Sequence, residues 1–524
     1  MSQTENDKPL NVLFVITDQQ RADHNGFMGN QILETPNLDR LASNGMVFEN
    51  AWVSNPVCMP NRSTILTGRM PSSHGVIFND RSLDPNSNTF AKTFRAAGYR
   101  TGLIGKSHLQ HGVSKNSMIP FRGEGSMASN HSKGWNEVED CERYLDGIPP
   151  NPDDFYGFDQ IDLSIDHGAK ISGHHFQWAL DRGANREDIL VHQDDDGLAQ
   201  YRSKNWRQIF KPAYSEDIHS TTFVTERTIA FIDEATQEQK PWLAWCSFPD
   251  PHHPMTPPGK WFNRYKPEDM VLPESRHDPL TDAPRHLQMF SKIHPKDQRN
   301  YVAPCGYGSD ELLCEAIAAT YGMIGMIDEG VGKIMARLES LGVRDNTIVV
   351  FTSDHGDMMG EHSLFLKGFM HYRGTLQVPL VIDAPGIAAG RTNSLASSID
   401  LGPTLLDLCN LKAYDGMQGS SLQPILENSA AKVREAILVE DDVPLVTSKL
   451  AKLPARIRTV ITESHRYTSN TAREEQLYNL MEDPDEMVSI TSNKAALIEA
   501  KENLIQLMMM ADDSSRGAPT TSDV

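Results

Sequence analysis

The sequence predicts an α/β fold, in which helices cover both faces of a large, mostly parallel sheet. The first observation is that buried strands alternate with amphipathic helices in residues 1–110 and again from about 225 to 430. Strands separated by helices pair in parallel, and such a sheet is buried on both faces. The second observation is a change near residue 430, after which shorter strand-like runs precede one last helix. This change predicts a smaller C-terminal α+β domain.

The expected strands are short apolar runs, and the expected helices repeat apolar residues at intervals of three and four. Asn11–Thr17 is a continuous apolar strand. Residues 321–341 carry apolar side chains at helical spacing, and Gly342 ends that helix. The other elements expected in the large domain are strands at 101–104, 242–248, 347–351 and 379–382 and helices at 35–44 and 221–234.

These elements predict a catalytic domain over residues 1–430 and a small α+β domain over residues 431–524. The stretch from about 111 to 220 is rich in Gly, Asn, Asp and His and only weakly periodic, so we interpret it as a long insertion over the edge of the sheet. Its acidic run at 194–196 is expected to be a solvated loop. In the second domain we expect strands at 436–439 and 458–462, a helix at about 493–510 and a loose tail.

The chain as a whole is acidic, with a formal net charge of −21 and a sequence pI of about 5.3. Nucleic acids and anionic membranes require clustered Lys and Arg, so neither kind of partner is expected. If the substrate is an anion, the positive charge that binds it must be confined to a pocket.

The N-terminus and the cysteines favour a reduced, cytoplasmic setting. The first nine residues lack the basic start and long apolar stretch of a secretory signal. No run of about 18 apolar residues occurs, so no membrane-spanning segment is expected. The six cysteines are scattered without a CxxC pair, which argues against both a disulfide framework and a zinc site. Whether the chain forms a homo-oligomer stays open.

Two predicted strands lead into acidic residues that lie far apart in the chain. Asp18 and Gln19 follow the first strand, and Asp354 and His355 follow the strand at 347–351. In open α/β sheets ligands bind beyond the carboxyl ends of the strands, so these side chains are expected to meet. Carboxylate and amide oxygens with one imidazole suit Ca²⁺, Mg²⁺ or Mn²⁺. The alternative is that each Asp only caps the helix that follows.

Two further strands lead into cationic or imidazole side chains. Lys106 and His108 follow the strand at 101–104, and His252 stands in the Pro-His-His-Pro loop after the strand at 242–248. The prolines fix the backbone of that loop and hold its rings at the edge of the sheet. Lys367 stands in a loop beside Gly368. Taken alone, each of these residues is also compatible with a structural or surface role.

The sharpest pattern is Cys-Met-Pro-Asn-Arg at residues 58–62. Pro60 suits the first turn of a helix and Gly68 its end, which places Cys58 at a helix N-terminus that favours an anion. Arg62, one turn further on, lies close to it. The alternative is a buried structural cysteine, the commonest fate of a free thiol. The pattern Cys-x-Pro-x-Arg rarely occurs by chance, since a random chain of this length is expected to contain on the order of 0.02 such patterns.

Together these residues resemble the type I, formylglycine-dependent sulfatase family of the alkaline phosphatase superfamily. Cys58, Pro60 and Arg62, with Leu-Thr-Gly-Arg at 66–69, look like the sulfatase signature. Gly-Lys-Ser-His at 105–108 is similar to the second signature of the family, Pro-His-His-Pro at 251–254 to its Pro-His-x-Pro loop, and Ser-Asp-His-Gly at 353–356 to its metal turn. The resemblance implies an alkaline-phosphatase-like fold and omits most of 111–220 and 276–310.

The resemblance also implies a mechanism. A separate formylglycine-generating enzyme converts Cys58 to formylglycine, and one hydroxyl of its hydrate attacks sulfur in line. One divalent metal ion per subunit, Ca²⁺ or Mn²⁺ with Mg²⁺ as a third option, holds that hydroxyl. The second hydroxyl then allows the intermediate to collapse and release sulfate.

The implied roles of the side chains fall into three groups. The metal ligands are Asp18, Gln19, residue 58, Asp354 and His355. Arg62, Lys106 and Lys367 neutralise the transferring group and the surroundings of the nucleophile. His252 protonates the leaving alcohol or phenol, and His108 steers the release of sulfate.

Two positions depart from the family pattern. Asn61 stands where the family usually has a Ser between Pro and Arg. The Cys, Pro and Arg on which maturation mainly depends are all present. The usual second Asp after the first strand is Gln19, a neutral ligand that is similar to the phosphonate monoester hydrolase branch. That branch lacks the Gly-Lys-x-His signature found at 105–108, so sulfate is favoured.

Three functions therefore compete. Hydrolysis of a small-molecule sulfate monoester is favoured, and hydrolysis of a phosphonate monoester or phosphodiester at the same site is the alternative. A metal-binding scaffold without catalysis is disfavoured, because every motif position that the chemistry needs is filled apart from the exchange at Gln19. Aryl, sugar and alkyl sulfates all stay open, since the leaving-group pocket is expected from 111–220 and 276–310, where no pattern guides the prediction.

Overall fold

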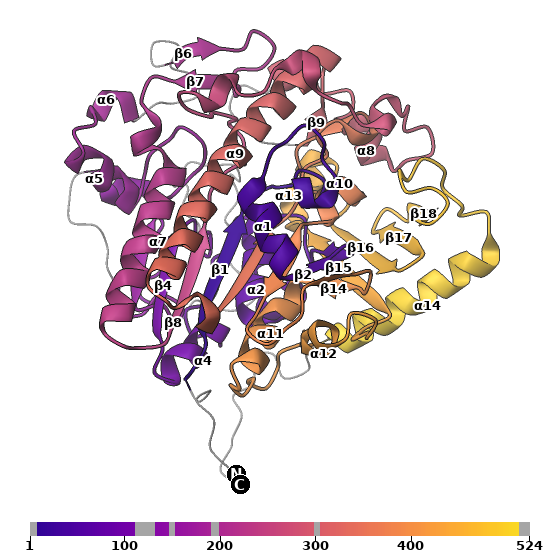
Figure 1. The fold of residues 1–524 in the computed structure, drawn as a ribbon. Helices are drawn as coiled ribbons and strands as arrows, with labels where there is room; N and C mark the ends of the chain where they lie inside the picture. Colours follow the sequence, from indigo (N-terminus) through magenta and orange to yellow (C-terminus); the bar gives the residue numbers. More distant parts are fainter. Residues whose placement is uncertain (1–7, 111–130, 146–151, 190–198, 298–303, 513–524) are drawn as a thin grey trace.

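The computed structural model describes residues 8–110, 131–145, 152–189, 199–297 and 304–512. Its centre is an eight-stranded sheet with helices on both faces (Figure 1). This is the large sheet that the sequence predicts. From one edge to the other its strands are β13 (Gly390–Thr392), β2 (Met46–Phe48), β12 (Leu380–Asp383), β10 (Thr347–Ser353), β1 (Asn11–Thr17), β8 (Trp242–Ser247), β4 (Arg100–Gly105) and β5 (Gln160–Leu163).

The strands that carry the predicted site run parallel to one another. β1 pairs in parallel with β10 and β8, and β8 pairs in parallel with β4, whereas β12 is antiparallel to its neighbours. Thr17 is in register with Ser353, so Asp18 and Asp354 leave the sheet side by side. The carboxyl ends of these parallel strands therefore lie along one edge of the sheet, as predicted.

Both faces of β1 are buried. Successive side chains of a strand point to opposite faces, so the side chains of β1 pack alternately on the two sides of the sheet. Val12, Phe14 and Ile16 pack on the side of α2 (Cys58–Thr67), α4 (Phe90–Ala96) and α11 (Leu401–Leu408). Leu13 and Val15 pack on the side of α1 (Pro36–Asn44), α7 (Ser220–Gln237) and α9 (Asp310–Ser340). This burial explains why the strand reads as a continuous apolar run.

The helix expected at 321–341 begins eleven residues earlier, at Asp310. Ser309 caps its N-terminus, since its hydroxyl accepts a hydrogen bond from the amide of Leu312 at 3.2 Å. Residues 316–328 are buried on every side, so this part of α9 has no polar face. The helical periodicity therefore weakens where the helix lies deepest.

The stretch expected to be an insertion over the edge of the sheet contributes the edge strand itself. β5, at 160–163, pairs in parallel with β4, and Gly105 is in register with Leu163. These four residues of 111–220 therefore belong to the sheet itself, and their run is too short to show a period. The description of the stretch as an insertion stays a prediction. The acidic run at 194–196 lies outside the described residues.

A four-stranded antiparallel sheet follows the large one and lies beside it (Figure 1). Its strands are β15 (Ala436–Asp442), β16 (Arg456–Thr462), β17 (His465–Asn470) and β18 (Glu475–Asn479), and α14 (Lys494–Ala511) packs against them through Leu497 and Leu504. The expected C-terminal α+β architecture is confirmed, while the boundary at residue 430 stays a prediction. Among the described residues, every helix is too short or too polar to span a bilayer.

Candidate active site

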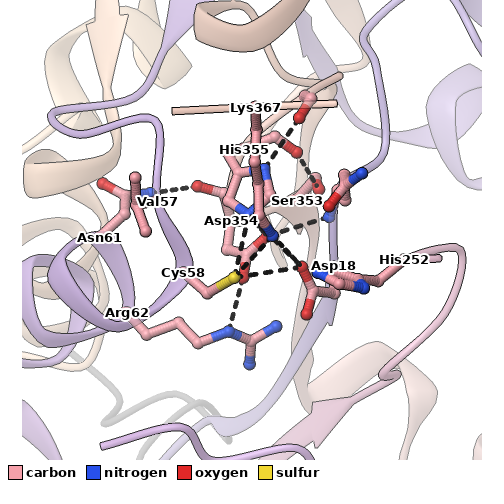
Figure 2. A network of polar contacts seen from close by, with 12 residues as sticks. Asp18, Val57, Cys58, Asn61, Arg62, His252, Ser353, Asp354, His355 and Lys367 are labelled. Atoms are coloured by element: carbon pink, nitrogen blue, oxygen red, sulfur yellow. Dashed lines mark hydrogen bonds and ion pairs between the residues drawn. The ribbon is translucent and has the colours of Figure 1, made fainter. Parts of the chain in front are cut away.

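Cys58 lies at the centre of a buried group of polar side chains. It is the first residue of α2, and its sulfur is 3.7 Å from Oδ1 of Asp18, 3.2 Å from Nε2 of His355 and 2.9 Å from Nζ of Lys367. Figure 2 shows these side chains converging on the sulfur from separate segments of the chain. The spatial convergence that the sequence predicts for residue 58 is therefore present.

Four side chains of this buried group could hold a metal ion. The ligand atoms of Asp18, Cys58, Asp354 and His355 lie within 4.8 Å of one another, and all four residues are buried. His355 Nδ1 lies 2.8 Å from the carbonyl oxygen of Gly356. A proton on Nδ1 donated to that oxygen leaves the lone pair of Nε2 free to bind a cation. Burial lowers the pKa of His355 to about 4, so the ring is neutral at neutral pH.

Gln19 stands next to this group and has an unused acceptor. Its Nε2 is 3.0 Å from Nδ1 of His253 and donates to Asp357, and its main-chain amide donates to Oδ1 of Asp354 at 3.1 Å. Its Oε1 is buried without a hydrogen-bond partner among the described residues. A buried carbonyl oxygen of this kind is the ligand that a hard divalent cation takes. The donor set therefore fits such an ion, although the ligand role of Gln19 stays a prediction.

Burial and neighbouring positive charge act in opposite directions on Asp18. Burial by itself would raise the pKa of its carboxyl, but Lys106, His252 and Lys367 outweigh burial and hold that pKa well below its usual range. Burial would likewise lower the pKa of Lys367, yet the nearby Cys58 and Asp18 raise it. Asp18 is thus an anion and Lys367 a cation at neutral pH.

Arg62 ties the helix of Cys58 to the opposite wall of the site. Its Nε donates to Oδ2 of Asp354 at 2.7 Å, and its Nη1 donates to the hydroxyl of Ser247 at 2.8 Å and to the carbonyl oxygen of Lys106. With Lys106 and Lys367, it makes three cations around two carboxylates. The site therefore carries local positive charge inside an acidic protein, the arrangement that an anionic substrate requires.

Lys106, His252 and His108 reach the site from neighbouring strand ends. Lys106 Nζ contacts Oδ2 of Asp18. The ring of His252 stacks on that of His253 with centroids 4.0 Å apart, and burial together with neighbouring imidazoles and Lys367 holds its pKa well below the usual range. His108 lies further out, with its ring centroid 6.2 Å from that of His167.

Sequence reasoning missed three residues of the site. His167 contacts Lys106 and stacks on His252, and Glu139 accepts hydrogen bonds from the main-chain amides of 108–110. Both belong to the stretch 111–220, which is only weakly periodic. Asp357 contacts Gln19 and holds the amides of Met359 and Leu366. His167 follows β5 by four residues, and β5 is too short to be recognised from the sequence, so no sequence signal pointed to His167.

The fold and this buried group together define a class, the metal-binding hydrolases built on an alkaline-phosphatase-like α/β sheet. A family model described as Sulfatase matches residues 10–411, and one described as N-sulphoglucosamine sulphohydrolase, C-terminal, matches residues 360–511. The first covers well over half of the chain, so the chain belongs to the sulfatase family. It is a hydrolase of sulfuric ester bonds, and the resemblance read from the motifs is confirmed.

Individual relatives cover almost the whole chain. An arylsulfatase of Clostridium perfringens is 29% identical over 499 residues, which are 92% of this chain and 90% of the relative. The multifunctional alkaline phosphatase superfamily protein PehA of Trinickia caryophylli is 26% identical over 510 residues, 93% and 92% of the two chains. The crystal structure of a phosphonate monoester hydrolase of Agrobacterium radiobacter is 26% identical, covers 98% of this chain and 97% of its own, and superposes with a TM-score of 0.77.

Proposed function

We propose that this protein hydrolyses a sulfate monoester to an alcohol or phenol and sulfate, with a formylglycine derived from Cys58 as its nucleophile. The observation that carries the proposal is the position of Cys58. A structural thiol would lie among apolar side chains, whereas this one faces two carboxylates, an imidazole and an ammonium group at a helix N-terminus. Formylglycine in this place supplies, as its hydrate, one hydroxyl to attack sulfur and a second that permits sulfate to be released.

The metal would be held by Asp18, Asp354, His355, the side chain at position 58 and Gln19. A bound divalent cation supplies a Lewis acid that favours an ionised hydroxyl at neutral pH. Ca²⁺ and Mn²⁺ suit this mixture of oxygen and imidazole donors, with Mg²⁺ as the third option. The Oε1 of Gln19, which has no hydrogen-bond partner in the described ranges, supports its assignment as a ligand.

The chain's own cations would bind the sulfuryl group. Lys367 lies closest to position 58 and Lys106 lies across Asp18 from it, so an anion bound between them meets positive charge on two sides. Arg62 orients Asp354 and balances its charge. These preorganised charges stabilise the transition state as charge moves onto the leaving oxygen.

His252 would donate the proton to that leaving oxygen from its imidazolium form, which the negative charge of a bound substrate favours. Its Nδ1 contacts the carbonyl oxygen of His253, which leaves Nε2 as the nitrogen that exchanges protons with substrate. His108 would act from further out, beside His167, during the release of sulfate. Both roles follow from the family resemblance and from the positions of these rings near Asp18 and Lys106.

A phosphonate monoester or phosphodiester hydrolase is the second candidate. Two observations favour it: Gln19 replaces a second carboxylate, and the superposition on the phosphonate monoester hydrolase is close. Lys106 and His108 favour sulfate, because they complete the Gly-Lys-x-His signature. A comparison of kcat/KM on aryl sulfate and on phosphonate monoester substrates separates the two, and a higher value on the phosphonate would assign the second.

The formylglycine is tested by producing the protein together with a formylglycine-generating enzyme. We expect the mass of the peptide containing residue 58 to change and sulfate release to appear with the change. Cys58→Ser should fold and lose turnover, because a serine could accept the sulfuryl group but could not release it. Full activity of Cys58→Ser, or of protein whose Cys58 is unmodified, would refute the mechanism.

A further inference from the structure

His167 lies against the buried charges of the site without a role in the chemistry described so far. Its Nε2 contacts Nζ of Lys106 and is 3.3 Å from Oδ2 of Asp18. Its ring stacks on that of His252, with centroids 3.6 Å apart and planes 18° apart. The side chain of His167 is 17% exposed, whereas those of Lys106 and Asp18 are 4% and 0% exposed. His167 therefore stands between the buried charges and solvent.

The other nitrogen of the His167 ring contacts Asp166, which itself forms an ion pair with Lys170. Nδ1 of His167 is 3.2 Å from Oδ1 of Asp166, and Oδ2 of Asp166 accepts a hydrogen bond from Lys170 at 2.6 Å. The ammonium of Lys106 only donates hydrogen bonds, so its contact takes the lone pair of Nε2 and the ring proton lies on Nδ1, where the carboxylate of Asp166 accepts it. Asp166 thus stabilises the tautomer that accepts from Lys106.

The same geometry could be taken for a second metal site. The ligand atoms of Asp18, His167 and His252 lie within 4.8 Å of one another. Nζ of Lys106, however, contacts both Asp18 and His167. A divalent ion in this group would lie against a buried ammonium, and the repulsion between them is strong where water is excluded. The ammonium of Lys106 itself is the cation that this group binds.

We propose that His167 is a positioning residue for the sulfate-ester hydrolysis proposed above, on which this inference rests. Its Nε2 fixes the ammonium of Lys106, and its ring supports the ring of His252. The edge strand β5 would thereby supply a part of the site that holds a cation and an imidazole in place for the sulfuryl group and the leaving oxygen. One divalent ion per chain is enough for this site, because Lys106 occupies the second cation position.

Three substitutions separate the two contacts of His167. In His167→Gln the amide oxygen can reach the position of Nε2 and accept from Lys106, whereas in His167→Asn it is one methylene too short. His167→Phe keeps a ring on His252 without an acceptor. His465, on β17 of the C-terminal sheet, serves as the control histidine, and His465→Ala should leave kcat and KM unchanged.

We expect kcat on an aryl sulfate to fall about 10–100-fold in His167→Asn and His167→Phe, with a smaller rise in KM, because the Lys106 contact matters most as charge develops. His167→Gln should recover part of that loss. The loss in His167→Gln should be larger on alkyl than on aryl sulfates, since a poor leaving group depends more on His252. A purely structural role would give neither the recovery nor the dependence on the leaving group.

Metal analysis completes the test, with one divalent ion per chain expected in the wild type and in all three variants. The proposal is overturned if His167→Asn and His167→Phe keep the kcat and KM of an active wild type, or if Gln and Asn lose activity equally. Two ions per chain would overturn the assignment of Lys106 as the second cation. Failure of the underlying function is a separate result, a wild type with modified residue 58 that releases no sulfate.

Discussion

The ammonium of Lys367 lies 2.9 Å from the sulfur of Cys58, although 309 residues separate them in the chain. Two carboxylates hold the loop that carries Lys367. Asp357 accepts from the amide of Leu366 on one side, and Asp441 of β15 accepts from the amide of Phe369 at 2.8 Å on the other. The C-terminal sheet thus helps to place a cation against the residue proposed as nucleophile.

Removal of that cation should cost turnover more than stability. In Lys367→Met we expect kcat on an aryl sulfate to fall about 10²–10³-fold, the usual effect of losing one group that stabilises charge in the transition state. Lys333→Met is the matched control, because within the described part of the chain Lys333 pairs only with Glu329, on the exposed face of α9. Equal kcat values for the two variants would contradict the role of Lys367.

The buried ion pair of Arg62 should contribute more to the free energy of unfolding than an exposed ion pair of similar length. Arg62 and Asp354 are 2.7 Å apart with fully buried side chains, and Arg40 and Glu339 are 2.8 Å apart at the surface. With divalent cations removed by a chelator, Arg62→Ala takes the ion-pair partner away from the buried Asp354, so we expect a loss of about 3–5 kcal/mol in the free energy of unfolding. Arg40→Ala should cost about 0–1 kcal/mol.

These two variants are best compared by urea unfolding of protein made without the maturation enzyme, so that residue 58 is the same in both. A difference between them of less than about 1 kcal/mol would show that Arg62 is not needed to compensate the charge of Asp354.

Divalent cations should stabilise the folded protein. An ion that binds only the native state adds about 2.7 kcal/mol at a concentration 100 times its Kd. We therefore expect Ca²⁺ or Mn²⁺ to raise the melting temperature and a chelator to lower it and abolish sulfate release. Asp354→Asn should lose most of this response. A melting temperature that neither cation nor chelator changes would argue against the metal site.

Asp328, which is not among the proposed metal ligands, should make the stability of the protein depend on pH. Burial raises the pKa of its carboxyl to about 6, despite hydrogen bonds from the amides of Asn37 at 3.0 Å and Leu38 at 2.8 Å. In the unfolded chain an Asp titrates near 3.9. The stabilisation by the protonated carboxyl is therefore complete below about pH 4 and is lost as the pH rises through about 6.

Asp328→Asn is neutral at every pH and should gain melting temperature relative to the wild type as the pH rises from about 4 to about 7. Thermal unfolding of both proteins across this range measures the difference. A difference that does not change with pH would contradict the raised pKa.

Local patterns predicted the elements that carry most of the site. The apolar run of β1 followed by Asp18, and the pairing of Pro60 with Gly68 around α2, are properties of a few adjacent residues, and the structure has both. The first turns of α9 were missed, and residues 316–320 within them are buried on every side, so they lack the polar face from which a helix is recognised. The roles assigned to the site residues stay predictions.

The sequence by itself determined which chemical groups are available and which short segments present them: a cysteine at a helix start, an Asp after each of two strands, a lysine after a third. Only the tertiary structure decided that His167 meets Lys106 and that Asp441 supports the loop of Lys367. The physical reason is that these contacts depend on which strands become neighbours. β5 joins the edge of the large sheet by pairing with β4, and Asp441 of β15 accepts a hydrogen bond from the amide of Phe369. Both contacts join segments that lie far apart in the chain, and no property of four or seven residues specifies such a contact.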